Sequence, residues 1–273
     1  HNPKTDWCFK IKSDPGLGGR EMNYPRGKTL GGSSSINGLL YIRGQSQDYN
    51  YWRQLGNVGW SWEDVLPYFK KSEDNQRGTN EFHGVGGPLS VEDMRVKMKV
   101  LDTFIDAAEE FGFPRQSDFN TGENEGIGYF QVTQRNGFRC STAVGYLNPI
   151  KNRKNLNIIT KAHVKNIEFE NNKAVAVNYW LNNQLIKIKA NIEIILSAGS
   201  IGSPHILQAS GIGPGELLKK NNVEVIKDQS AVGQNLQDHL MLRPVYKIKN
   251  LQTLNEVYHS FIKKIFTGIN YFI

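Results

Sequence analysis

An apolar run that leads directly into a helix start constrains the fold of this chain more than any other feature. Ile192–Leu196 is typical of a buried strand, Ser197–Ser200 is a turn of small residues, and a helix is predicted over Ser203–Ser210. Ser203 is a favoured N-cap residue, and Pro204 suits the first helical position. A strand, a small-residue turn and a helix N-terminus together place backbone N–H groups against a phosphate or a flat ligand.

A β-meander is predicted just before this segment. Short apolar or alternating patterns indicate successive strands at Ile158–Ile159, Val164–Phe169, Ala174–Trp180 and Leu185–Lys189. Asn171-Asn172 and Asn182-Asn183 stand at two of the reversals. Because Asn tolerates the left-handed backbone of tight hairpin turns, these pairs favour antiparallel connections.

Three amphipathic helices are also predicted. Ser61 is an N-cap followed by Asp64 at the third helical position, with an apolar face that continues to Phe69. A second helix fits Val100–Phe111 and ends before Gly112. A third apolar pattern runs from 257 to 271 and is interrupted by two lysines, which favours an amphipathic helix over a membrane anchor. The stretches 74–88 and 120–128 indicate loops.

A glycine-rich stretch over residues 13–48 contains the first candidate site. Gly27-Lys28-Thr29 is similar to the end of a phosphate-binding P-loop, but that motif requires a glycine where Met22 stands. What remains is a cradle of small residues over Gly27–Gly38, which suits an extended polar ligand such as a dinucleotide. On composition alone, ligand contact and an ordinary tight loop are equally good explanations.

Composition excludes several classes of function. The net charge of +7 comes from scattered basic residues without interleaved aromatic side chains, so we expect no nucleic-acid partner. Cys8 and Cys140 are too few for a disulfide scaffold or a thiolate zinc site, and we expect two separate reduced thiols. No apolar stretch of about 18 residues predicts a transmembrane helix. No metal-binding His pattern or hydrolase elbow is present in the sequence.

Two long motifs together point to a family. Gly27–Asn50 and Gly199–Gly213 resemble the two signature motifs of the glucose-methanol-choline (GMC) oxidoreductases, flavoproteins that oxidise alcohols. Four further segments resemble the same family: Gly59–Phe69, Phe82–Val91, Gln134–Tyr146 and Val232–His239. The similarity covers nearly the whole chain. It is strongest to bacterial choline-dehydrogenase-like and FAD-dependent alcohol-dehydrogenase-like members.

The resemblance implies a mixed α/β fold. We expect an incomplete Rossmann-like FAD-binding domain with the β-meander, together with part of the GMC substrate-binding domain. Residues 1–240 would form the FAD-binding region, with substrate-domain segments inserted at roughly 60–150. Residues 241–273 would begin the substrate-binding or C-terminal part.

The resemblance also implies which residues contact FAD. By motif position, the pyrophosphate, ribityl chain and isoalloxazine edge would lie along Gly31, Gly32, Ser33, Asn37, Gly38 and Leu40. Val164 matches a backbone contact to the adenine, and Ala198 and Gly199 match the turn that closes over the adenosine half. Some relatives attach FAD covalently through a His just before the Asn of the first signature. Ile36 stands there, so we expect non-covalent FAD.

Two features of the family are missing from these residues. The sequence contains no GxGxxG fingerprint, and it ends before the late position of the family's catalytic His. The abrupt ends at His1 and Ile273 predict an internal fragment that is inactive by itself. None of the six His residues is assigned a catalytic role, and His239 is expected to be structural.

The implied function is oxidation of the CH–OH group of a small-molecule alcohol, choline or another. Hydride would pass from the alcohol carbon to flavin N5, with the His beyond this chain as the base. Oxygen, a quinone and other electron acceptors remain alternatives. The alternative function is a non-catalytic binding or scaffold protein that keeps the FAD fold. Cysteine usage and the bacterial resemblance favour a cytoplasmic location, with attachment to a membrane surface as a variant of it.

Overall fold

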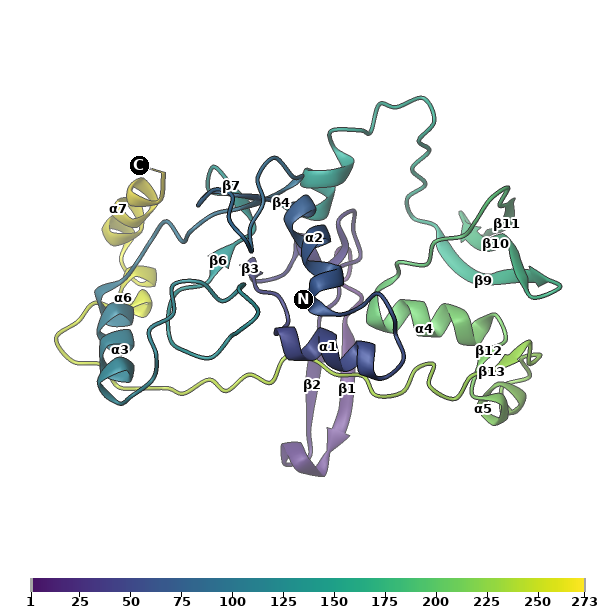
Figure 1. Cartoon of the computed structure of the whole chain (residues 1–273), viewed down its shortest axis with the longest axis horizontal. Coiled ribbons are helices and arrows are strands. Elements are labelled where there is room, and N and C mark those ends of the chain that lie inside the picture. Colours follow the sequence, from purple (N-terminus) through teal and green to yellow (C-terminus); the bar gives the residue numbers. More distant parts are fainter. Residues whose placement is uncertain (1, 273) are drawn as a thin grey trace. The chain divides into compact units, whose positions relative to one another are not determined.

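The computed structural model describes residues 2–272 (Figure 1). It contains two compact units: residues 157–245 form one, and the residues before and after them form the other. The mixture of helices and short sheets agrees with the predicted α/β class. His1 and Ile273, on which the prediction of a fragment rests, lie outside the described residues. The functional division into residues 1–240 and 241–273 stays a prediction.

The β-meander in residues 157–245 is confirmed. Three antiparallel strands lie in the order β11–β10–β9, with β9 at His163–Glu170, β10 at Lys173–Leu181 and β11 at Gln184–Lys189. Both Asn pairs at the reversals have positive φ angles, from 48° to 63°. Two successive residues of positive φ give the turn whose twist matches that of a hairpin.

Two predicted strands are wrong. Ile158–Ile159 and Ile192–Leu196 are not strands, because no described strand forms a hydrogen-bonded ladder with either segment. Ile192 and Ile195 are largely exposed as a result. An apolar run by itself predicts burial, whereas a strand also needs a neighbour that satisfies its backbone groups.

The helix after this run starts earlier than predicted. Helix α4 spans Gly199–Ala209 with Ala198 as its N-cap, so Pro204 lies inside it. Ser203 still acts at the helix start, because its Oγ accepts a hydrogen bond from the Ala198 N–H at 3.0 Å. At the other end of α4, Ser210 Oγ accepts from the Ile167 N–H of β9 at 2.8 Å and joins the helix to the meander.

A small parallel pair completes this unit. β12 (Ile212–Gly213) lies beside β13 (Lys227–Asp228), and the short helix α5 (Gly215–Lys220) follows β12. The Asp228 carboxylate accepts a hydrogen bond from the Gly215 N–H at 2.9 Å. This bond fixes the start of α5, whose Leu218 side chain is buried.

The other unit begins with elements that the sequence did not predict. A hairpin of β1 (Phe9–Asp14) and β2 (Arg20–Tyr24) closes through a 3₁₀ turn, and helix α1 spans Ser46–Gln54. Glycine density alone had indicated turns in this stretch. Helix α2 (Trp62–Ser72) confirms the prediction around Ser61: Ser61 and Asp64 form the expected capping box.

Short two-stranded sheets hold the centre of this unit (Figure 1). Their strands are β3 (Leu40–Tyr41) with β6 (Gln131–Val132), β4 (Glu73–Asn75) with β5 (Leu89–Val91), and β7 (Gln134–Arg135) with β8 (Phe138–Arg139). The loop predicted at 74–88 therefore starts within β4, while 120–128 is a loop as expected. A single π-helical turn, Ala143–Leu147, follows β8.

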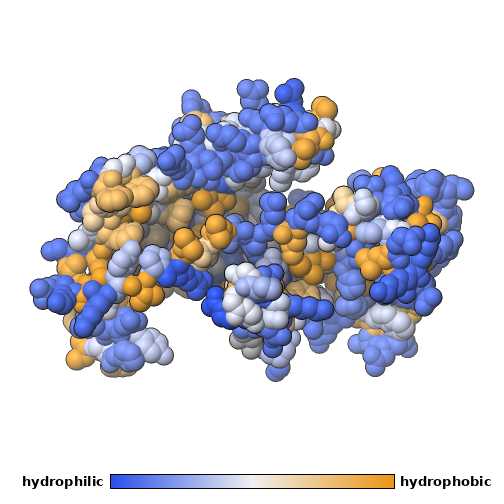
Figure 2. Space-filling view, turned by 90° about the horizontal axis from the view of Figure 1, so that it is seen from below, coloured by the Kyte–Doolittle hydropathy of each residue, from blue (hydrophilic) through white to orange (hydrophobic). Residues whose placement is uncertain are grey.

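Helices α3 (Lys99–Glu110), α6 (Leu254–Tyr258) and α7 (Phe261–Phe272) complete the unit. The predicted third helix is thus two helices, separated at His259-Ser260. Apolar side chains gather on the left of Figure 2, over the end of the unit that carries α3 and α7. No helix among residues 2–272 is long and apolar enough to cross a membrane. The cytoplasmic location stays a prediction.

Candidate functional site

The residues predicted to contact the cofactor fall into two groups. Gly31, Gly32, Ser33, Asn37, Gly38 and Leu40 lie within ten residues of one another in the unit that contains β3. Val164, Ala198 and Gly199 lie in the unit that contains the meander. The assignment of both groups to FAD stays a prediction.

The first group lies in a tightly folded loop, residues 27–39, which we call the signature loop. Gly31 and Gly32 have φ angles of 84° and 54°, and the 3₁₀ turn η2 spans Gly32–Ser35. A Cβ on Gly27 would approach the Gly32 carbonyl oxygen to 2.1 Å, so no side chain fits there. Ser33 Oγ accepts a hydrogen bond from the Gly27 N–H at 3.1 Å. Glycine is therefore required at Gly27 and Gly31 for the loop to close.

Other glycines of the loop face open space. A Cβ built on Gly32 or on Gly38 would meet no heavy atom within 4 Å. Gly38 also lacks a positive φ angle, so nothing in the protein itself demands glycine there. Open space beside accessible backbone is what a bound dinucleotide would fill, and this observation fits the predicted FAD contact.

The end of the loop is shaped by Asn37. Its Oδ1 accepts hydrogen bonds from the Leu39 N–H at 3.1 Å and from Arg139 Nη1 at 2.8 Å. Leu39 adopts a left-handed backbone with a φ angle of 69°. Leu40 then enters β3 with half of its surface exposed, opposite Val132 of β6. The Asn37 side chain thus positions the loop backbone, in addition to any contact with a ligand.

The second group combines a strand residue with a helix start. Val164 belongs to β9 and pairs with Tyr179 of β10. Ala198 is the N-cap of α4, and Gly199 has a φ angle of 82°. A Cβ on Gly199 would meet nothing within 4 Å, as at Gly38. The start of α4 is thus open and suited to an anionic or flat ligand.

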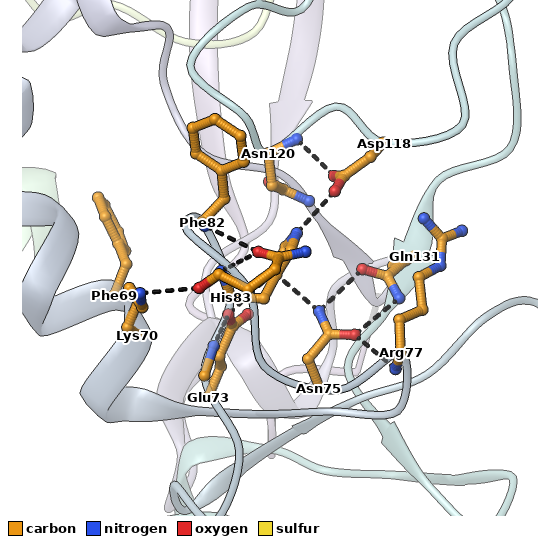
Figure 3. A network of polar contacts seen from close by, with 12 residues as sticks. Phe69, Lys70, Glu73, Asn75, Arg77, Phe82, His83, Asp118, Asn120 and Gln131 are labelled. Carbon is orange, nitrogen blue, oxygen red and sulfur yellow. Dashed lines mark hydrogen bonds and ion pairs between the residues drawn. The ribbon is translucent and has the colours of Figure 1, made fainter.

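A second polar centre, which we call the buried network, lies among β4 and the loops around it (Figure 3). Glu73 is fully buried, and its Oε1 accepts from Arg43 Nη2 at 2.8 Å, from His83 Nδ1 at 2.9 Å and from the Gly84 N–H at 2.8 Å. His83 Nε2 donates to Asp118 Oδ2 at 2.7 Å. Two cations and two carboxylates therefore neutralise one another, and of the four side chains only Asp118 is partly exposed.

Amide side chains extend the buried network. Asn75 and Gln131 exchange two hydrogen bonds, of 3.1 and 3.2 Å, and Gln131 Nε2 also donates to Asp93 at 3.0 Å. The Asn120 side chain accepts from the Arg43 N–H at 2.8 Å. Glu73 Oε2 is a buried oxygen without a hydrogen-bond partner among the described residues. The network joins segments that are distant in the sequence.

The pKa values follow from these contacts. Burial opposes a charge on His83, but the hydrogen bonds from its ring to Asp118 and Glu73 outweigh burial and raise its pKa to about 9. Burial by itself would raise the pKa values of Glu73 and Asp118. Their hydrogen bonds with His83, and for Glu73 also the charge of Arg43, outweigh burial and lower both pKa values. Burial raises the pKa of Tyr41 to about 12. At neutral pH the imidazolium and both carboxylates are charged.

Sequence reasoning did not find the buried network. His83 lies in a segment that resembles the family, and no sequence pattern distinguishes Glu73 or Asp118. The one signal in the sequence is the Phe82-His83-Gly84 segment between glycine-rich loops. No group of His, Cys, Asp and Glu among residues 2–272 could hold a metal ion. Cys8 and Cys140 are free thiols, as predicted.

Comparison with known proteins decides the family. The model of the GMC oxidoreductase family matches residues 13–241, which include the signature loop, the buried network and the meander. This chain is a GMC oxidoreductase family member. The GMC family consists of FAD-dependent flavoproteins, so the resemblance seen in the two signature motifs is confirmed.

Two curated GMC relatives illustrate the similarity. An oxygen-dependent choline dehydrogenase of Brucella anthropi is 42% identical over 235 residues, covering 86% of this chain and 43% of the relative. An alcohol dehydrogenase [acceptor] of Pseudomonas putida is 39% identical over 272 residues, covering 98% of this chain and 49% of the relative. The chain therefore spans about half the length of the curated relatives it matches.

Solved structures of two other enzymes share the fold. An FAD-dependent oxidoreductase from Chaetomium thermophilum superposes with a TM-score of 0.81 at 31% identity, covering 86% of this chain and 43% of that one. Pyridoxine 4-oxidase from Mesorbium loti has a TM-score of 0.77 at 32% identity, covering 82% of this chain and 44% of that one. These matches support a mixed α/β fold that forms part of an FAD-binding architecture.

Proposed function

We propose that this chain supplies part of the FAD site, and part of the substrate domain, of an enzyme that oxidises a small alcohol. The observation that carries the proposal is the signature loop, in which Gly32 and Gly38 leave open space beside the backbone. Two named relatives, a choline dehydrogenase and an alcohol dehydrogenase, support the substrate class. Choline and primary alcohols are therefore the first substrates to test.

The residues of the signature loop bind and orient the cofactor in this proposal. The pyrophosphate, the ribityl chain and the isoalloxazine edge lie along Gly31, Gly32, Ser33, Asn37, Gly38 and Leu40. Val164, Ala198 and Gly199 contact the adenosine half. The chemistry that bound FAD would supply is acceptance of a hydride from the alcohol carbon at flavin N5. A His outside these 273 residues takes the hydroxyl proton.

The cofactor is non-covalent in this proposal. Ile36, at the position where some relatives carry the linking His, ends η2 with an aliphatic side chain that has no nucleophilic atom. Denaturing the flavin-loaded protein should release all of the yellow colour into solution. Flavin that stays with the precipitated protein would count against non-covalent binding.

Dye reduction tests the activity. The 273 residues and the complete reading frame that contains them are purified, and their flavin content and dye reduction are measured with choline and with primary alcohols. We expect turnover from the complete reading frame and none from the 273 residues alone. Turnover by the 273 residues would contradict the placement of the catalytic His. Flavin binding without turnover of any alcohol by the complete reading frame would favour the scaffold alternative.

A further inference from the structure

One arginine connects the β7–β8 hairpin to the signature loop. Arg139, the last residue of β8, donates from Nη1 to the Ser34 carbonyl oxygen at 2.9 Å and to Asn37 Oδ1 at 2.8 Å. Its Nη2 donates to the Asn37 carbonyl oxygen at 2.9 Å. A planar guanidinium presents several donors in a rigid fork, whereas a lysine ammonium is a single point of charge. The fork therefore holds Ser34 and Asn37 in a fixed relation.

The backbone that carries Arg139 is itself held firmly. The hairpin turns at Asn136 and Gly137, which have φ angles of 52° and 78°, and the Glu92 carboxylate accepts from the N–H groups of both at 2.5 and 3.2 Å. Beyond Arg139, the backbone N–H of Cys140 donates to the Thr133 carbonyl oxygen at 3.0 Å. The guanidinium thus acts from a rigid base.

Thr142 adds a second attachment to the same loop. Its backbone N–H donates to Ser34 Oγ at 2.9 Å, and its Oγ1 donates to the Gly31 carbonyl oxygen at 3.2 Å. Ser34 Oγ in turn donates to the same Gly31 oxygen at 2.5 Å. A Cβ on Gly31 would lie 3.1 Å from Ala143, so loop and π-helical turn are in close contact. Residues 139–143 therefore hold both ends of η2.

The charge on Arg139 is not neutralised. All three of its acceptors are neutral oxygens, and no carboxylate in the described part of the chain forms an ion pair with it. Arg43 differs, because Glu73 pairs with it in the buried network. Since a guanidinium stays protonated, a positive charge is fixed beside the signature loop. An anion bound along that loop would experience its attraction.

We propose that Arg139 is a positioning residue for the cofactor. It holds the signature loop in the shape that receives FAD, and its unpaired charge favours the anionic diphosphate. This inference rests on the proposed FAD function. Neither the family match nor the signature motifs assign this role to Arg139, which lies about a hundred residues after the loop it holds.

Two substitutions separate shape from charge. Arg139→Lys keeps the charge and loses the fork, and Arg139→Gln loses both. Amide hydrogen exchange of residues 29–38, measured without FAD, should be faster in both variants than in the parent. FAD affinity, measured by flavin fluorescence in the complete reading frame, should fall about 10- to 100-fold for Arg139→Gln, as expected for charge-assisted hydrogen bonds. For Arg139→Lys the loss should stay below roughly tenfold, because the charge remains.

Two further variants provide a control and an independent test of the loop attachment. Arg135→Gln changes an arginine on the same hairpin that donates to the Pro88 carbonyl oxygen at 3.2 Å. It should leave loop exchange and FAD affinity unchanged. Thr142→Val removes the hydrogen bond from the Thr142 hydroxyl to the Gly31 carbonyl oxygen and should accelerate amide exchange in the signature loop. This variant tests the attachment of the loop independently of how well the Arg139 variants fold.

The experiments test the positioning role of Arg139, the role of its charge and the proposed FAD function separately. Parent-like exchange in Arg139→Gln and Thr142→Val would overturn the positioning role. Equal FAD affinities of the Lys and Gln variants would overturn the role of the charge. If the unsubstituted complete reading frame binds no FAD, the proposed function fails and with it the charge role, whereas the exchange experiment still decides whether Arg139 holds the loop.

Discussion

The signature loop and the buried network lie in the same unit and use charge in opposite ways. In the buried network, Arg43 and His83 are paired with Glu73 and Asp118, and these side chains have little or no exposed surface apart from part of Asp118. In the signature loop, Arg139 is bound to neutral oxygens, and glycines leave open space. Polar groups that satisfy one another hold a fold together, whereas groups left available are suited to a ligand.

The largest effect on stability is expected from breaking the buried network. Glu73→Ala leaves Arg43 and His83 buried beside each other without their shared carboxylate. Removal of one partner from a buried ion pair costs about 3–5 kcal/mol in the free energy of unfolding. Urea unfolding followed by circular dichroism measures this loss.

An exposed acid provides the matched control. Glu81 lies in the loop between β4 and β5 and is exposed. Glu81→Ala should therefore change the free energy of unfolding by less than about 0.5 kcal/mol. Similar losses for the Glu73 and Glu81 variants would show that the network contributes nothing special to stability.

The pH dependence of stability tests the same network. The pKa of His83 is raised to about 9 in the folded protein from 6.5, so its contribution is complete below pH 6.5 and is lost as pH rises through 9. Between those values the folded state holds a proton that the unfolded state lacks, and the free energy of unfolding falls by up to ~1.4 kcal/mol per pH unit. Unfolding of the parent and of His83→Gln from pH 6 to 10 measures this slope. Identical slopes would contradict the assignment of the proton to His83.

A smaller loss of stability is expected where the signature loop packs tightly against itself at Gly27. Gly27→Ala places a Cβ 2.1 Å from the Gly32 carbonyl oxygen, so the loop backbone must move. Overpacking of this kind costs about 1–3 kcal/mol. Thermal unfolding should detect the loss, and hydrogen exchange should place it in residues 27–39. A neutral substitution would show that the loop is not packed as described.

The sequence predicted well those elements whose signals are local. The Asn pairs of the meander and the Ser61 capping box each act through neighbours a few residues away, and both are present in the structure. Ile192–Leu196 failed as a strand because its identity depends on a partner strand, which an apolar pattern does not reveal.

The candidate site shows the same difference between local signals and features that depend on distant residues. The glycines of the signature loop could be identified from a motif, and whether they contact FAD stays a prediction. The buried network and Arg139 depend on contacts between residues that are ten to about a hundred positions apart. Such pairings carry no periodicity or spacing rule, so they became apparent from the three-dimensional structure alone.

FAD titration of a single glycine variant tests the central claim most directly. Gly38→Ala adds a methyl group that meets no atom of the protein within 4 Å, and Gly268→Ala on α7 does the same away from the loop. Both variants should fold as the parent does. If the signature loop receives FAD, Gly38→Ala in the complete reading frame should bind FAD about tenfold or more weakly, and Gly268→Ala should bind it normally. Equal FAD affinity of both variants and the parent would contradict the account.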